Sequence, residues 1–338
     1  MLRRLIIWLI TLAGCAGIVM ATSYGFSPAS TTPSWRLVDV PPGARLTDLA
    51  DRLQNQGIIR SKVCFLAAAR ISGESNYLQP GQYRLSPSMS PMNILDDLAK
   101  GMVATEWVVI PEGSSLRQIG LILEKHHLAN QRRFDAALRH GVSVYRRPLH
   151  LTASTLEGYL FPDTYKIPRT MNEAAIVKLM VERFKQVKVE RLLPTIKKKT
   201  NGLSFADTMI LASLVEKEAA KNEERAHIAG VLLNRLRGGI KLQCDASIEY
   251  ILPQHKAHLT HQDLAINSPY NTYEHRGLPP APICCPGLDS IEAALRPQAT
   301  HDMYYVATPD GYHLFSKTLA EHDQDIVRAE QIKADQGL

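Results

Sequence analysis

The sequence lacks paired cysteine motifs and long runs of charge of one sign. Its five cysteines stand at positions 15, 64, 244, 284 and 285, and none forms a CxxC pair. Neither a disulfide framework nor a cysteine-based zinc site is therefore indicated. The net charge is +6, and basic residues occur in short groups such as Arg132-Arg133 and Arg146-Arg147. Such groups are typical of solvated helix faces, so we expect no nucleic-acid partner.

Several catalytic signatures are also missing. Ser213 has no Gly-x-Ser-x-Gly context, and the chain has no Walker-type glycine loop, so acyl transfer and nucleotide hydrolysis have no support. His255, His258 and His261 are spaced three residues apart but lie outside any HExxH motif. We expect neither a metal nor a cofactor, and a metal-dependent hydrolase built on these histidines is kept as a lesser alternative.

One long apolar run is present, at the N-terminus. The basic residues Arg3 and Arg4 precede the uncharged stretch 5–22. Roughly 18 apolar residues are enough to cross a bilayer, and a basic head stays in the cytoplasm. We therefore predict a single-pass membrane anchor and linker start over residues 1–26, with the remainder of the chain on the far side of the membrane. A cleaved signal peptide, or a lipoprotein signal ending at Cys15, is the alternative.

The exported part has the pattern of an α+β protein in two domains. A small α+β module is predicted over residues 35–104 and a larger α+β domain over 105–335. A β-type run that ends in a Pro/Gly turn, at residues 40–43 and again at 110–113, is followed each time by a helix with apolar residues three and four apart. This pattern indicates either an internal repeat or convergent turn chemistry. The other predicted elements are helices over 61–71, 92–100, 173–188, 204–221 and 223–237, strands over 80–85 and 107–110, and a hairpin over 303–307 and 312–315.

The predicted helix over 204–221 carries the most informative carboxylates. It is apolar on nearly every side, so it should be buried, yet it contains Glu216 and Glu218. At about 100° per residue these two side chains point roughly 200° apart and cannot form one paired site. Glu218 shares its side with Leu211 and Leu214, where desolvation would raise its pKa and keep it protonated, as a general acid requires. A helix-end ion pair is the alternative for both glutamates.

Several motifs around this helix resemble the endolytic murein transglycosylase family in order and spacing. They are EGYLFPDTY at 157–165, ASLVEKE at 212–218, NRL at 234–236, LQCD at 242–245, SPYNTY at 268–273, GLPPAPI at 277–283 and HLF at 313–315. The resemblance runs from the apolar N-terminal segment to near the C-terminus. Cys244 departs from it by standing where Ser or Thr is usual, and Cys284-Cys285 replace small residues.

The resemblance implies a single-pass anchor in the inner membrane, a small LysM-like module and a catalytic domain in the periplasm. This domain has one essential glutamate, which the motif places at Glu218. It implies a lyase that cuts nascent peptidoglycan strands internally, leaves 1,6-anhydro-muramyl ends and works beside the glycan polymerases to set strand length. One carboxyl suffices, because the C6 hydroxyl of the muramic acid replaces the attacking water.

Substrate contacts are expected from a further set of polar side chains, each of which could equally shape a turn: Gln243, Asp245, Tyr270, Asn271 and Tyr273. The alternative function is a non-catalytic, membrane-anchored peptidoglycan-binding protein in which Glu218 is structural.

Overall fold

The computed structural model describes Trp8, Met20 and residues 23–73, 78–192, 202–254, 256 and 258–335. Mixed helices and small sheets make the chain an α+β protein, as expected. The chain divides into two compact units, residues 1–106 with 166–170, and residues 107–165 with 171–338. None of the described helices has the length and apolar character needed to cross a bilayer. The predicted span over residues 5–22 lies outside the described residues, apart from Trp8 and Met20.

The first unit is built from short strands and helices around one apolar core. In chain order they are β1 (Arg36–Val40), α2 (Leu46–Asn55), α3 (Lys62–Ser72), β2 (Gly81–Leu85) and α4 (Pro91–Ala99). β1 and β2 pair antiparallel, with Arg36 opposite Leu85. The largest side chains of the core, Phe65 and Tyr83, are completely buried. These side chains belong to a cluster of buried apolar residues within the unit, so the unit has its own hydrophobic core.

The two copies of the suspected repeat have the same local structure. β1 leads through a turn into α2, and β3 (Thr105–Val109) leads through a turn into α5 (Leu116–Lys125). Gly43 and Gly113 occupy equivalent turn positions with φ of 76° and 73°, the left-handed region that favours glycine. After each helix a main-chain amide donates to the carbonyl of a leucine five residues earlier. These hydrogen bonds run from Ile58 to Leu53 and from Leu128 to Leu123. The predicted strand, turn and helix are thus confirmed in both places.

A strand and a long helix are among the elements that were not predicted from the sequence. β4 (Thr164–Pro168) pairs with β3, and α6 (Gln131–Leu149) packs against α7 (Glu173–Val187). α6 is polar overall, and Pro148 near its end obscures the pattern. Its buried residues Phe134, Leu138 and Tyr145 nevertheless follow a helical spacing. The predicted helix over 173–188 is confirmed as α7.

A buried helix lies at the centre of the remaining fold, α9 (Phe205–Glu218), and Ser204 caps its start. α9 contacts α10 (Arg225–Arg237), α11 (Asp245–Ile251) and α13 (Leu288–Leu295). The predicted helix over 204–221 ends three residues too late, because Ala219 adopts an extended backbone with ψ of 116°. The helix predicted from residue 223 begins two residues later, after the 3₁₀ turn η3 (Asn222–Glu224).

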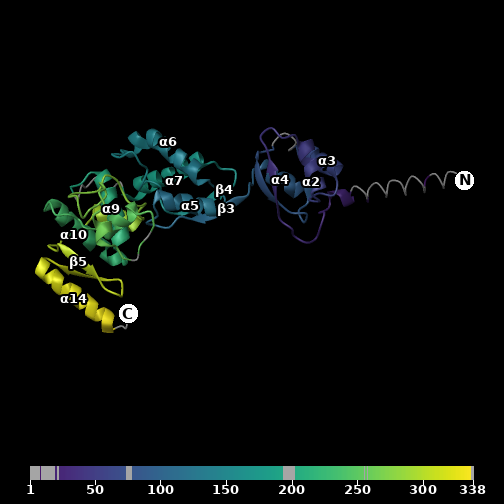
Figure 1. The fold of residues 1–338 in the computed structure, drawn as a ribbon. Coiled ribbons are helices and arrows are strands. Elements are labelled where there is room, and N and C mark those ends of the chain that lie inside the picture. The colour runs from purple at the N-terminus through teal and green to yellow at the C-terminus, as the bar shows by residue number, and fades with distance from the viewer. Residues whose placement is uncertain are drawn as a thin grey trace. The chain divides into compact units, whose positions relative to one another are not determined.

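The chain ends in a hairpin covered by a helix (Figure 1). β5 (Tyr304–Ala307) and β6 (His313–Ser316) pair antiparallel, which confirms the predicted hairpin. The unpredicted helix α14 (Leu319–Asp335) packs against both strands. β5 also contacts α10, so the hairpin is joined to the core of the second unit.

Candidate active site

Glu218, the last residue of α9, borders a cavity of about 420 Å³ in the second unit. The start of α11 and strand β5 supply much of the remaining lining, including Asp245 and Tyr305. α9 holds Glu218 firmly, because the residues from Met209 to Val215 along this helix are all buried. Leu211 and Leu214, the two side chains predicted to share the side of Glu218, have no exposed surface.

The surroundings of Glu218 favour its protonated form. Burial raises its pKa from the ordinary 4.5 to about 7, and the negative charges of Asp245 and Glu249 add to the rise. Hydrogen bonds with Tyr305 and Cys244 act in the opposite direction and limit the rise. Near neutral pH the carboxyl is therefore present in both forms, and it can give and take a proton.

Glu216 lies in a different environment, as the helical geometry predicted. Its carboxylate pairs with the Arg225 guanidinium at 3.4 Å and accepts a 2.9 Å hydrogen bond from the Gly287 amide. These bonds link α9 to the start of α10 and to the start of α13. Glu216 is thus a structural ion pair, and the two glutamates do not form one site.

Three of the five predicted substrate-binding residues line the Glu218 cavity: Gln243, Asp245 and Tyr273. The Tyr273 hydroxyl donates to the Asp245 carboxylate at 2.5 Å. Gln243 has φ of 55°, in the left-handed region. Its main-chain amide donates to the main-chain carbonyl of Thr272 at 3.1 Å. The cavity therefore contains two carboxyl groups, Glu218 and Asp245, and the second is exposed and held by a tyrosine.

The other two predicted residues lie elsewhere. Asn271 is completely buried, and its side-chain amide donates to the carbonyls of Leu264 and Ile266. Its side-chain oxygen accepts from the amides of Tyr273 and Glu274, so Asn271 braces the loop that carries Tyr273. Tyr270 lines a separate cavity beside α11, described further below.

Tyr305 and Arg235 are among the residues of this cavity that were not singled out from the sequence. Tyr305 hydrogen-bonds with Glu218, although it comes from the distant strand β5. Arg235, in the NRL motif, donates to the Leu242 carbonyl at 2.7 Å and to the Gln243 side-chain oxygen at 3.0 Å, which fixes Gln243. In the predicted strand over 303–307, side chains point alternately to the two faces, which places Tyr305 on one of them. This pattern does not predict which group the Tyr305 hydroxyl contacts.

The motif that follows the SPYNTY segment packs on α9 through small polar groups. The Ser213 hydroxyl donates to the Ile210 carbonyl and accepts from the Ile283 amide at 3.0 Å. The Cys284 thiol lies 3.4 Å from the Ser213 carbonyl, and the four described cysteines are all free thiols. Ser213 therefore joins this loop to the helix of Glu218, a packing role.

A second buried acid, Glu157, begins the EGYLFPDTY motif. Only 3% of it is exposed, and burial raises its pKa to about 8. Its carboxyl accepts from the Leu116 amide at 3.0 Å and from the Tyr250 hydroxyl at 3.3 Å. Sequence reasoning did not single out Glu157 as an acid, because the motif shows no other sign of burial at that position.

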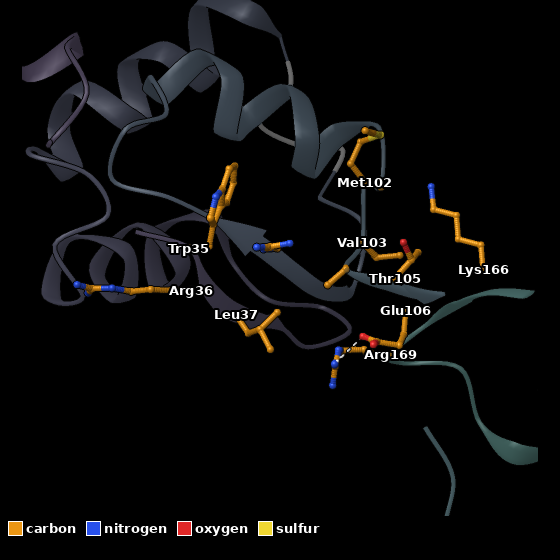
Figure 2. A pocket seen from close by; sticks show the side chains of 12 residues that line it. Trp35, Arg36, Leu37, Met102, Val103, Thr105, Glu106, Lys166 and Arg169 are labelled. Atoms are coloured by element: carbon orange, nitrogen blue, oxygen red, sulfur yellow. Dashed lines mark hydrogen bonds and ion pairs between the residues drawn. The ribbon is translucent and has the colours of Figure 1, made fainter. Parts of the chain in front are cut away.

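The first unit has a cavity of its own, of about 580 Å³ (Figure 2). Figure 2 shows the ion pair between Glu106 and Arg169, whose atoms lie 2.7 Å apart, and the indole of Trp35 apart from it. The Arg84 guanidinium lies 5.2 Å from the centre of the Trp35 ring.

The described residues contain no group of three His, Cys, Asp or Glu side chains arranged to hold a metal ion. His258 and His261 are among these residues, whereas His255 lies outside them. The expected lack of a cofactor stays a prediction.

Comparison with known proteins identifies the family. The model of the YceG-like family matches residues 38–328. The chain is 32% identical over 302 residues to the endolytic murein transglycosylase of Bacillus subtilis, covering 85% of this chain and 82% of that protein. It is 29% identical to the endolytic murein transglycosylase of Streptococcus pneumoniae, over 86% of this chain and 57% of that protein.

A solved structure of a YceG-like protein from Listeria monocytogenes aligns with a TM-score of 0.60 and 30% identity, covering 86% of this chain and 98% of the other. The residues matched by the family model, 38–328, include the motifs around Glu218. This chain belongs to the YceG-like family.

Proposed function

We propose that this protein is an endolytic lytic transglycosylase that cleaves the bond between N-acetylmuramic acid and N-acetylglucosamine in nascent peptidoglycan strands. The main support is Glu218, a carboxyl with a pKa raised to about 7 at the edge of a cavity. The names of the relatives, endolytic murein transglycosylases, support an enzyme that cleaves peptidoglycan.

In the proposed reaction Glu218 acts twice. Its protonated carboxyl donates to the bridging glycosidic oxygen, so the bond from that oxygen to the C1 carbon of the muramic acid breaks. The resulting carboxylate takes the proton of the C6 hydroxyl as that oxygen bonds to C1. The product is a 1,6-anhydro ring, no water is consumed, and Glu218 returns to its protonated form.

Neighbouring groups have supporting roles in this reaction. The sugar develops positive charge at C1 in the transition state. The negative Asp245 carboxylate in the same cavity would stabilise that positive charge. Asp245 also raises the pKa of Glu218. Gln243, whose side-chain oxygen is held by Arg235, is the proposed contact with the sugar. The side chain of Asn271 is instead fully used within its own loop.

The presence of Asp245 makes hydrolysis the reaction to exclude, because ordinary glycosidases use two carboxyl groups. Digestion of purified glycan strands in ¹⁸O-water separates the two reactions. We expect anhydro ends without ¹⁸O, and loss of these ends with Glu218→Gln. The exposed residue Glu274 supplies the control, since Glu274→Gln should cut normally. New reducing ends that contain ¹⁸O would contradict the proposal.

The second candidate function is a peptidoglycan-binding protein without catalysis. It is favoured by the cavity of the first unit, where Trp35 offers a ring face beside Arg84. We propose that this unit is the LysM-like module, which its strand–helix–helix–strand order supports. Strand binding by Glu218→Gln with no cleavage by the unaltered protein would favour this second function.

Location and partners complete the proposal. The apolar run over residues 5–22 supports an anchor in the inner membrane, with both units in the periplasm beside the glycan polymerases. Protease treatment of intact spheroplasts should degrade both units. Protection of the second unit would contradict this placement.

A further inference from the structure

A second cavity of the second unit, of about 610 Å³, lies beside the catalytic cavity. Lys217 lines this cavity and the next residue, Glu218, lines the catalytic one. α11 is shared in the same way, because Asp245 borders the catalytic cavity while Glu249 and Tyr250 border the other. Glu249 also acts electrostatically on Glu218. A ligand bound at Glu218 therefore has the second cavity within reach.

One side of the second cavity is formed by a neutral acid and two tyrosine rings. Glu157 lines it, and burial raises the pKa of its carboxyl to about 8, so this acid is mostly neutral near pH 7. Tyr250 donates to Glu157, and its ring lies 5.0 Å from that of Tyr270. The two rings give the cavity an apolar face.

Two cations, Lys217 and Arg117, border the same cavity. Lys217 and Arg117 are exposed, and neither forms an ion pair with another residue in the part of the chain that the structure describes. The Arg117 guanidinium donates to the Pro253 carbonyl at 2.9 Å, which holds it at the cavity. With Glu157 neutral, Glu249 is the one negative side chain in the lining.

We propose that this cavity binds the peptide branch of the peptidoglycan strand, with Lys217 and Arg117 pairing with the free carboxylates of that peptide. Sugar rings of the strand carry no charge at this position, whereas the peptide on the muramic acid is acidic. The peptide is attached to the muramic acid, the same sugar whose bond at C1 is cut at Glu218. The peptide can therefore reach the adjacent cavity. The volume suits a branch of this kind, since ligand pockets span roughly 300–1,000 Å³.

This inference rests on the proposed function and is tested with two substrates, strands that carry peptides and strands from which an amidase has removed them. We expect Lys217→Gln to raise KM for peptide-bearing strands about tenfold and to leave KM for peptide-free strands unchanged. Lys217→Arg should restore the preference. Lys125→Gln, an exposed lysine at the end of α5, is the matched control and should behave as the unaltered protein.

Binding without cleavage keeps the two hypotheses separable. With Glu218→Gln, peptide-bearing strands should bind about tenfold more tightly than peptide-free strands, and adding Arg117→Gln should reduce this ratio. Equal binding and equal KM for the two substrates, with normal cleavage, would overturn the inference and leave the proposed function standing. If neither substrate is cut by the unaltered protein, the proposed function fails, and the binding ratio still decides the inference.

Discussion

Replacing Glu218 by glutamine should stabilise the protein at neutral and alkaline pH. The folded protein holds the Glu218 proton up to a pKa of about 7, whereas the unfolded chain releases it near 4.5. Between these two values the folded state binds more protons than the unfolded chain. The contribution of Glu218 to the free energy of unfolding is therefore fully present below pH 4.5 and is lost as the pH rises through about 7. Glutamine is neutral at every pH and removes this dependence.

The magnitude follows from the same two pKa values. Because one pKa unit corresponds to about 1.4 kcal/mol, the rise of the Glu218 pKa from 4.5 to about 7 limits the gain to roughly 3 kcal/mol above pH 7. Below about pH 4.5 the variant and the unaltered protein should have the same stability. The contribution of Glu157, whose pKa is also raised, is present in both proteins and cancels from the difference.

Amide hydrogen exchange in the full chain can measure this difference. The buried amides of α9 report the opening of the part of the fold that contains Glu218. The free energy of opening should diverge between Glu218→Gln and the unaltered protein as pH rises, and Glu274→Gln should show no divergence. Identical pH dependence in all three proteins would refute the desolvation of Glu218.

Three further substitutions test the surroundings of Glu218. Tyr305→Phe removes a hydrogen bond that lowers the pKa of Glu218, so the alkaline limit of cleavage should move to higher pH in the pH–rate profile. Cys244→Ser offers Glu218 a stronger donor than a thiol, so the same limit should move to lower pH; an unchanged limit in both variants would contradict these contacts. Asn271→Ala should lower the free energy of unfolding by about 1–3 kcal/mol in urea titration, because it removes a completely buried side chain that hydrogen-bonds to partly buried main-chain carbonyls and amides.

The position of Glu218 was predictable because its determinants are local. A helix that is apolar all round has to be buried, and the spacing within one helix fixes which neighbours share a side. The same geometry separated Glu216 from Glu218, and the ion pair of Glu216 with Arg225 confirms it. The early end of α9 depended instead on the backbone of Ala219, which has no signal in the sequence.

The remaining site depends on contacts between distant segments. Tyr305 reaches Glu218 only because the C-terminal hairpin docks against α10. The role of Asn271 could not be predicted for a different reason. A side-chain amide uses the same nitrogen and oxygen to bind a sugar as to hydrogen-bond within its own loop, as Asn271 does. Burial of Glu157 results from packing of α5 and α11 around it, which a single motif does not reveal.

A ¹³C NMR titration of the glutamate side-chain carboxyls, with Glu218→Gln used to assign the signal, measures the ionisation of Glu218 in the free protein. The signal missing from the variant should titrate with a midpoint near 7, as expected for an acid desolvated at the end of α9. A midpoint near 4.5 would mean that Glu218 is ordinarily solvated and ionised at neutral pH, and that it cannot supply the proton for cleavage.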